Sequence, residues 1–152
     1  MARYYEDLML GEVVRSSAVA LSEWEIIKFA KKYDPLSIHT DPDAAKASSF
    51  GGVIASGTHL IAHWSSLNSA ICNDIQWICG LGFEELRFLK GLRPDVPVYV
   101  TAECTKKRLS QSDPKQGVVT YHYELRESGG DTILSFWSTT LVHTRNSQIT
   151  AS

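Results

Sequence analysis

Cysteine, long apolar runs and any excess of one charge are scarce in this sequence, and each scarcity excludes a class of protein. Of 152 residues only three are cysteines, Cys72, Cys79 and Cys104, and no two have Cys-x-x-Cys spacing. An odd number without that spacing argues against a disulfide framework and a zinc ribbon. No segment approaches the roughly 20 apolar residues that span a bilayer, and acidic residues interrupt the opening "MARYYEDLMLGEVV" where a signal peptide needs an apolar run. We therefore expect a cytoplasmic protein with reduced thiols.

The charges are nearly balanced, with 15 Lys and Arg against 17 Asp and Glu. This balance argues against a general nucleic-acid footprint and against a polybasic membrane surface. The basic cluster Lys106–Arg108 is better explained as a solvated strand end than as a phosphate site. No internal repeat or low-complexity linker divides the chain, so residues 1–152 are predicted to form a single domain.

The first half of the chain carries helix signals. Ser22 and Glu25 have capping-box spacing, and Leu21 and Ile26 occupy the two positions of a hydrophobic staple, so a helix is predicted to begin there. It is expected to stop at Asp34, because the proline that follows disfavours the α conformation in the residue before it.

Two further helices are predicted. Asp41 followed by proline marks the start of a short one, which residues 50–52 are expected to end. In the segment 57–73, Leu60, Trp64, Leu67 and Ile71 form one apolar stripe, with mostly small residues on the remaining face. At about 1.5 Å per residue this helix is some 25 Å long, enough to cross a small domain.

The second half is predicted to be β-structure. Segments near 82–90, 97–109, 117–127 and 131–144 are rich in β-branched and aromatic residues, and the sequence at 129–131 is typical of a tight hairpin turn. Early helices and consecutive late strands indicate an α+β protein with an antiparallel sheet that curls around the long helix. A sheet of this kind leaves edges and apolar surface to be covered, which predicts a dimer.

The stretch between Tyr33 and Gly57 contains candidate catalytic groups. Asp34 and His39 are joined by an extended turn that can bring a carboxylate and an imidazole onto one water molecule, as proton transfer at neutral pH requires. Alternatively, Asp34 only terminates a helix and His39 only satisfies a backbone carbonyl. Ser56 and Gly57 fall at the start of the long helix, where free N–H groups favour developing negative charge. They also fit a plain N-cap and a packing contact.

Several motifs together resemble one known family. "Asp34-Pro-Leu-Ser-Ile-His39", "Asp41-Pro-Asp-Ala-Ala45", the run from Phe50 to Gly57 and "Leu86-Arg-Phe-Leu89" are similar to the MaoC-like dehydratases, which include the (R)-specific enoyl-CoA hydratases and have the hot-dog fold. The resemblance covers residues 4–142. This chain departs from the family's Asp-x-Asn-Pro-x-His motif because it lacks the asparagine. It also departs after "Arg-Phe-Leu", where the segment 91–96 replaces the family's usual proline and Gly-Asp pair.

The resemblance implies reversible addition of water to a trans-2-enoyl thioester, which gives an (R)-3-hydroxyacyl thioester. Asp34 would deprotonate the water, His39 would protonate the α-carbon, and the Gly57 N–H would stabilise the enolate-like oxygen, with Ser56 supporting the site. It also implies coenzyme A or acyl carrier protein as the acyl carrier, at least a homodimer, and neither a metal nor another cofactor.

Further residues are expected to contact the substrate: Tyr33, Phe50, Ile54, His59 and Arg87. Tyr33, Trp64 and Trp77 are candidates to line an acyl pocket, although aromatic side chains at such positions also fit a plain core. Arg87, Lys90 and Arg93 are candidates to meet coenzyme A phosphates, although exposed basic side chains at strand ends need no ligand.

Two other functions remain open, and a metal site is disfavoured. A hot-dog thioesterase would use Asp34 to direct water at the carbonyl carbon, and a non-catalytic subunit would only bind an acyl chain. The presence of both Asp34 and His39 argues against the non-catalytic subunit. His59 and His63 have the spacing of helical metal ligands, but the sequence offers no clear third ligand.

Overall fold

A computed structural model describes residues 1–150 of the chain, with side chains described up to residue 147. The elements, in chain order, are a 3-10 turn (Tyr5–Asp7), β1 (Val13–Arg15), α1 (Glu23–Tyr33), α2 (Ser37–Thr40), α3 (Pro42–Ala47), α4 (Gly57–Cys72), β2 (Trp77–Phe88), β3 (Val98–Leu109), β4 (Gln116–Glu127), β5 (Thr132–His143) and a final 3-10 segment (Arg145–Thr150).

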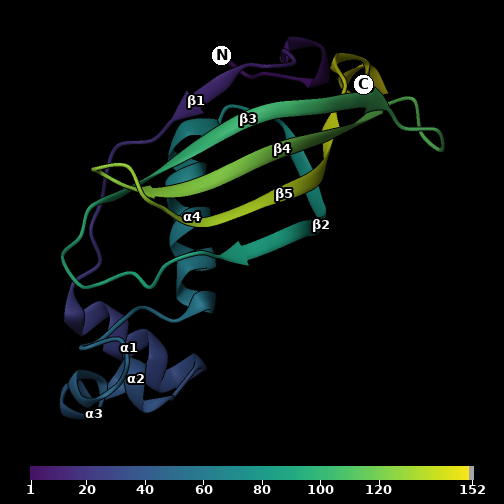
Figure 1. The fold of residues 1–152 in the computed structure, drawn as a ribbon. Coiled ribbons are helices and arrows are strands. Elements are labelled where there is room, and N and C mark those ends of the chain that lie inside the picture. Colours follow the sequence, from purple (N-terminus) through teal and green to yellow (C-terminus); the bar gives the residue numbers. More distant parts are fainter. Residues whose placement is uncertain (151–152) are drawn as a thin grey trace.

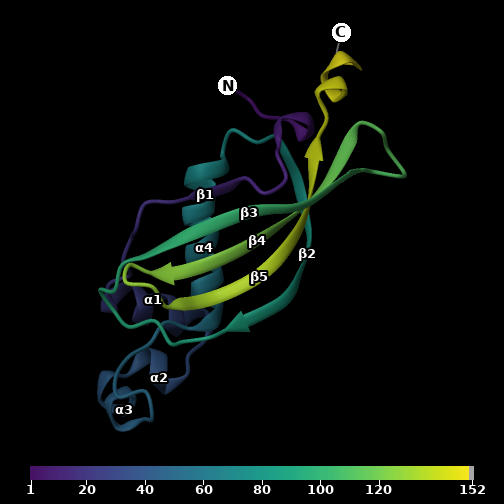
Figure 2. The same ribbon diagram turned by 45° about the horizontal axis from the view of Figure 1, so that its top comes forward.

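The strands form one antiparallel sheet in the order β1-β3-β4-β5-β2. The sheet curves around α4, while α1, α2 and α3 gather at one end of that helix and both chain termini lie toward the other (Figures 1 and 2). The α+β class and the sheet wrapped around a long central helix are confirmed.

The core lies between α4 and the concave face of the sheet. Trp64 of α4 makes edge-on contacts with Phe136 of β5 and Tyr123 of β4, with ring centroids 4.8 Å and 4.9 Å apart. Burying each such side chain contributes about 1.5–3 kcal/mol, so the α4 stripe and the sheet stabilise each other.

The start and end of α1 are as predicted. Ser22 Oγ accepts a hydrogen bond from the Glu25 N–H at 3.2 Å, while Glu25 Oε2 accepts from the Ser22 N–H at 2.8 Å. Leu21 and Ile26, the two staple residues, are both buried. The helix ends at Tyr33 with Asp34 as its C-cap, which fixes where the Asp34 carboxylate leaves the backbone.

Three predicted boundaries were wrong or incomplete. β2 begins at Trp77 rather than near residue 82, because its first residues pair with the end of β5, Trp77 opposite Val142. The segment between Asp34 and His39 was predicted to be an extended turn, but Ser37–Thr40 forms the short helix α2, which carries His39. α3 ends at Ala47, before the glycines that were expected to stop it.

β2 forms one edge of the sheet and exposes large apolar side chains. Leu81, Phe83 and Phe88 of β2 are 56%, 47% and 51% exposed, and Leu89, which follows the strand, is 57% exposed. An unpaired edge with this composition is the kind that proteins cover with another chain or element.

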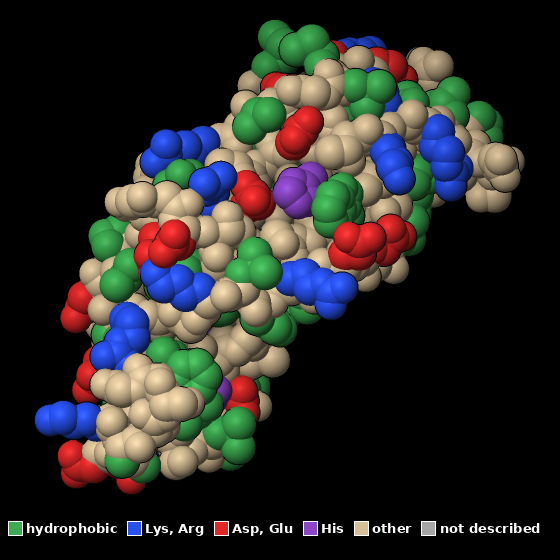
Figure 3. Space-filling view, in the orientation of Figure 1, with side chains coloured by type: hydrophobic (Ala, Val, Ile, Leu, Met, Phe, Trp, Pro, Cys, Tyr) green, Lys and Arg blue, Asp and Glu red, His purple; other side chains and the backbone are tan. Residues whose placement is uncertain are grey.

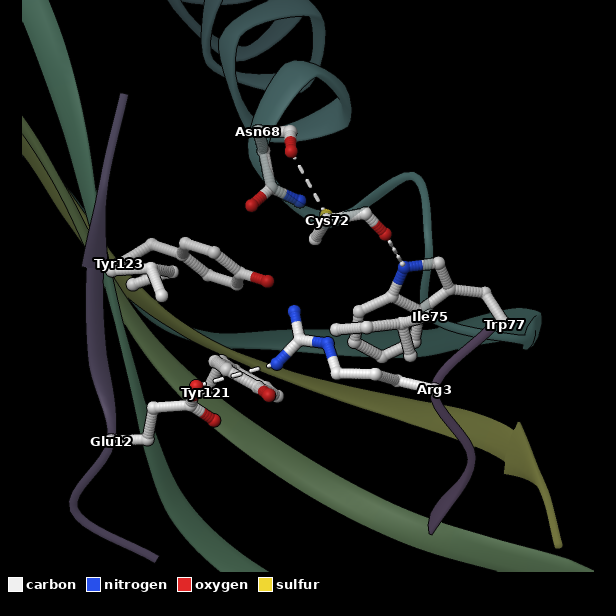
Figure 4. Close-up of a pocket in the computed structure, with 10 residues that line it drawn as sticks. Arg3, Glu12, Asn68, Cys72, Ile75, Trp77, Tyr121 and Tyr123 are labelled. Carbon is white, nitrogen blue, oxygen red and sulfur yellow. Dashed lines mark hydrogen bonds and ion pairs between the residues drawn. The ribbon is translucent and has the colours of Figure 1, made fainter. Parts of the chain in front are cut away.

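A small cavity lies at the C-terminal end of α4, where Asn68 and Trp77 face Tyr121, Tyr123 and Arg3 (Figure 4). Arg3 Nε donates to Asp74 Oδ2 at 2.7 Å and so fastens the N-terminal segment across this end. The cavity measures about 10 Å³, which is room for at most one water molecule. It is therefore a packing gap rather than a substrate site.

Candidate active site

His39 is held in a defined orientation by α2. The side chain is 6% exposed, and its Nδ1 lies 2.7 Å from the Ile54 carbonyl oxygen. A carbonyl oxygen can only accept a hydrogen bond, so Nδ1 carries a proton and donates it. The other ring nitrogen, Nε2, is thereby left to exchange protons on the opposite side, where it lies 3.7 Å from Asp34 Oδ2.

Asp34 reaches this position because α1 stops abruptly. Its backbone has φ −155° and ψ 72°, outside the helical region, as expected for a residue before proline. The Asp34 carboxyl group is 30% exposed. A gap of 3.7 Å is too long for a direct hydrogen bond, but one water molecule can contact both groups.

Ser56 and Gly57 form the start of α4. Ser56 is fully buried and is the N-cap, with Oγ accepting from the His59 N–H at 3.2 Å and lying 3.1 Å from Thr58 Oγ1. Gly57 is the first helical residue, and the first N–H groups of a helix have no partner within it. A backbone donor and the positive end of the helix dipole therefore lie beside His39.

A cleft of about 480 Å³, here called the His39 cleft, is lined by both His39 and Gly57. Its lining residues are His39, Phe50, Ile54, Ala55, Gly57, Leu60, Phe88, Leu89, Lys90 and Gly91. The structure thus brings His39 and Gly57 together with two of the predicted substrate contacts, Phe50 and Ile54.

The Phe88 ring lies against Gly57. A Cβ atom at residue 57 would lie 2.8 Å from Phe88 Cζ, so the half-exposed Phe88 ring would have to shift to make room for it. Phe88 and Leu89 were not predicted as site residues, although the "Leu86-Arg-Phe-Leu89" motif contains both of them. Their position depends on β2 running past the start of α4, which no local pattern specifies.

The other predicted substrate contacts lie elsewhere. Tyr33, which is 59% exposed, and His59 line a second cleft beside α1. Arg87 lies on β2 opposite Ser135 and outside both clefts. Trp64 and Trp77 line another cleft, of about 380 Å³, where Trp77 Nε1 donates to the Cys72 carbonyl at 3.0 Å. The structure therefore brings the two tryptophans into one cleft, but without Tyr33.

Two predicted phosphate-binding cations already have partners. Lys90 Nζ lies 3.0 Å from Glu127 Oε2 and 2.8 Å from Asp131 Oδ2. Arg93 donates to the carbonyl oxygens of Phe50 and Gly51 at 3.1 Å and 3.3 Å. The Arg93 bonds fasten the β2–β3 connection to the loop that follows α3, and the Lys90 ion pairs fasten it to the β4–β5 hairpin.

The residues at both departures from the family motif have structural roles in this chain. Leu36, where the family has asparagine, is the N-cap of α2, and its carbonyl oxygen accepts from the His39 N–H at 2.9 Å. Within the segment 91–96, Leu92 is fully buried and its carbonyl oxygen accepts from the Ala55 N–H at 2.9 Å.

His59 and His63 lie on the face of α4 that packs toward α1. Burial, followed by the nearby His63, lowers the pKa of His59 to about 4. Burial also lowers the pKa of His63, whose Nε2 lies 3.3 Å from the Val19 carbonyl oxygen. Within residues 1–147, no three His, Cys, Asp or Glu side chains are arranged to hold a metal ion.

Similarity to solved structures defines the class. A Mycobacterium tuberculosis protein described as having a double hot-dog fold superposes with a TM-score of 0.78, at 17% identity over 94% of this chain and 44% of that chain. The (R)-hydratase PhaJ1 from Pseudomonas aeruginosa superposes with a TM-score of 0.73, at 20% identity over 93% of this chain and 86% of that chain. The protein is a hot-dog fold protein.

The family is narrower than the fold. A family model described as "MaoC like domain" matches residues 8–125. The structure of a MaoC-like dehydratase from Rhodospirillum rubrum is 28% identical, with a TM-score of 0.86 over 95% of this chain and 99% of that chain. The chain belongs to the MaoC-like domain family.

Among the described residues, no helix is both long and apolar enough to cross a membrane. On the face seen in Figure 3, basic and acidic side chains are interspersed and form no broad field of one sign.

Proposed function

We propose that this protein reversibly hydrates a trans-2-enoyl thioester to an (R)-3-hydroxyacyl thioester. The observation that carries the proposal is the Asp34–His39 pair, whose Oδ2 and Nε2 atoms are 3.7 Å apart beside the first N–H groups of α4. Membership of the MaoC-like family and the similarity to a solved MaoC-like dehydratase support the same class of reaction.

The proposed chemistry begins with a water molecule held between Asp34 and the imidazolium form of His39. Asp34 takes one proton from the water as the water oxygen bonds to the β-carbon. The electrons of the double bond then move through the α-carbon toward the thioester oxygen. The Gly57 N–H stabilises the negative charge that develops there. His39 Nε2 then gives its proton to the α-carbon.

The cycle closes when the Asp34 carboxylic acid returns its proton to His39 Nε2. Nδ1 keeps its own proton throughout and donates it in a hydrogen bond to the Ile54 carbonyl oxygen, so only Nε2 exchanges protons. Because both groups act from one side of the substrate, hydroxyl and hydrogen add to the same face, which gives syn addition.

The proposal includes a homodimer formed through the exposed β2 edge, whose apolar side chains Leu81 and Phe83 a second copy would cover. The acyl group is carried as a thioester of coenzyme A or of acyl carrier protein. Arg87 lies on the same edge strand and remains a proposed substrate contact. The expected cytoplasmic location and the lack of any further cofactor belong to the same proposal.

The test uses purified protein and trans-2-enoyl-CoAs of several chain lengths, beginning with crotonyl-CoA. Loss of the conjugated thioester absorbance and release of free thiol are followed in parallel. The proposal predicts absorbance loss without thiol release, and an R product on chiral analysis. Thiol release at the same rate would show a thioesterase instead, and no signal across the panel would support a binding subunit.

A further inference from the structure

The loop between α3 and α4, residues 48–56, carries two parts of the His39 cleft. Phe50 lines the cleft from the first half of the loop, and Ile54 and Ala55 line it from the second half. The Ile54 carbonyl oxygen also accepts the hydrogen bond that orients His39. The shape of this loop therefore decides where one wall of the cleft and the imidazole ring lie.

The two halves of the loop are held in different ways. The second half is packed, because residues 53–55 are at most 7% exposed and the Ala55 N–H donates to the Leu92 carbonyl oxygen at 2.9 Å. The first half is open, since Phe50 is 49% exposed and is followed by two glycines, which restrict the backbone little. Burial thus fixes the part of the loop that orients His39, but not the part that carries the Phe50 side chain.

Arg93, in the connection between β2 and β3, holds this first half. Its Nη1 donates to the Phe50 carbonyl oxygen at 3.1 Å, and its Nη2 donates to the Gly51 carbonyl oxygen at 3.3 Å. The guanidinium group lies directly against Gly52, where a Cβ atom would be 2.7 Å from Arg93 Cζ. Because its donors lie in one rigid plane, the guanidinium fixes two successive carbonyl groups at once.

The connection that carries Arg93 runs along the whole loop. Gly91 packs against the second half, and a Cβ atom there would lie 3.2 Å from Ile54 Cγ2. Leu92 is fully buried and accepts the hydrogen bond from Ala55. Three successive residues thus support the loop, and Arg93 is the one that supports its exposed end.

We propose, on the basis of the proposed function, that Arg93 is a positioning residue that holds Phe50 as a wall of the His39 cleft. It takes no part in proton transfer, because burial and Leu92 hold the Ile54 half of the loop separately. Without the guanidinium group, the first half of the loop must become ordered each time substrate binds, which weakens binding. The loss therefore falls on KM and leaves kcat nearly unchanged.

The test measures kcat and KM with crotonyl-CoA for Arg93→Met, which keeps a long side chain but has no donor. KM should rise at least about fivefold, while kcat stays within about twofold and its pH dependence does not move. Because Arg93 is exposed, the urea midpoint should shift by no more than about 0.5 M. Arg108→Met is the matched control and should change none of these values, since Arg108 is also exposed and donates to a carbonyl oxygen, that of Leu109, at 3.3 Å.

Salt distinguishes this support from a simple attraction between Arg93 and an anionic substrate. The acceptors of Arg93 are neutral carbonyl oxygens in direct contact, so the rise in KM should persist at about 1 M salt, where charges are screened beyond about 3 Å. Arg93→Lys keeps the charge but not the planar pair of donors, and it should recover only part of the loss. A rise in KM that disappears at high salt, or complete recovery with Arg93→Lys, would show attraction by charge and overturn the proposal.

Hydrogen exchange measures the loop itself and does not need activity. In Arg93→Met the amides of residues 50–52 should exchange at least about fivefold faster than in the wild-type protein, as the loss of two hydrogen bonds would give, and Ala55 should be unchanged. A KM that does not rise, or exchange that does not change, would overturn the role of Arg93 and leave the hydratase intact. If the wild-type protein hydrates no enoyl thioester, the proposed function fails, and the exchange rates alone decide whether Arg93 holds the loop.

Discussion

Lowering the pH should destabilise this protein first through His59. The carboxylates that form helix caps and surface ion pairs become protonated only at lower pH. His59 has a pKa near 4 in the folded chain against an ordinary value of 6.5, so the folded state holds the ring neutral. Between these two values the unfolded chain binds a proton that the folded chain does not. Stability is therefore complete above pH 6.5 and falls as the pH drops toward 4.

The size of the effect follows from the two pKa values. Each unit of difference corresponds to about 1.4 kcal/mol, so the shift from 6.5 to about 4 sets an upper limit of about 3 kcal/mol for His59. His63 adds to it with the same sign, because burial lowers its pKa as well. Glu25, the acidic neighbour of both rings, opposes the effect slightly by favouring their charged forms. Between pH 7 and pH 5 we expect the free energy of unfolding to fall by about 2 kcal/mol.

Urea unfolding at a series of pH values measures this directly. His59→Gln should reduce the slope of stability against pH by about 1 kcal/mol per unit between pH 5 and 6, because it removes the main group responsible. His143→Gln, on the exposed end of β5, should leave the slope as it is. A wild-type stability that stays constant from pH 7 to pH 5 would refute the reasoning.

Three substitutions test the other parts of the account. Gly57→Ala should lower kcat/KM more than tenfold, because the new methyl group crowds the thioester. The free energy of unfolding should change by no more than about 1 kcal/mol, because the half-exposed Phe88 ring can move aside. Full activity would contradict this reasoning, and adding Phe88→Ala should not restore the rate. Ser22→Ala should cost about 1 kcal/mol by removing the cap, and an unchanged urea midpoint would count against the capping box. Phe136→Ala should cost about 3–5 kcal/mol, and a loss below about 1 kcal/mol would mean that the α4–sheet core is packed differently.

Local signals predicted α1, which ends at Asp34, and α4, which begins at Gly57, but not α2, which carries His39. The capping box at Ser22 and the proline after Asp34 fixed both ends of α1, and Ser56 was expected at the start of α4, where the structure has it as the N-cap. These features depend on neighbouring residues only, so a single sequence contains them. The approach of the Asp34 and His39 side chains was also predicted from the short segment that joins them. Their catalytic roles rest on the family resemblance.

Contacts between distant segments were beyond the sequence. Phe88 lies over Gly57 because β2 passes the start of α4, and Lys90 turns away to Glu127 and Asp131 because the β4–β5 hairpin lies beside it. Tyr33 was expected to line a pocket with two tryptophans but lines the separate cleft beside α1. Such placements follow from the packing of the whole sheet.

The central claim is that Asp34 and His39 act together on one water molecule. The most direct measurement is kcat with crotonyl-CoA for Asp34→Asn and His39→Gln. Each variant is compared with the wild-type protein after urea unfolding has shown that the two are equally stable. The account predicts that each variant loses at least about a hundredfold in kcat, and that combining them costs little more than either alone, because the pair acts as a unit. A folded variant of either kind that keeps near wild-type kcat would contradict it.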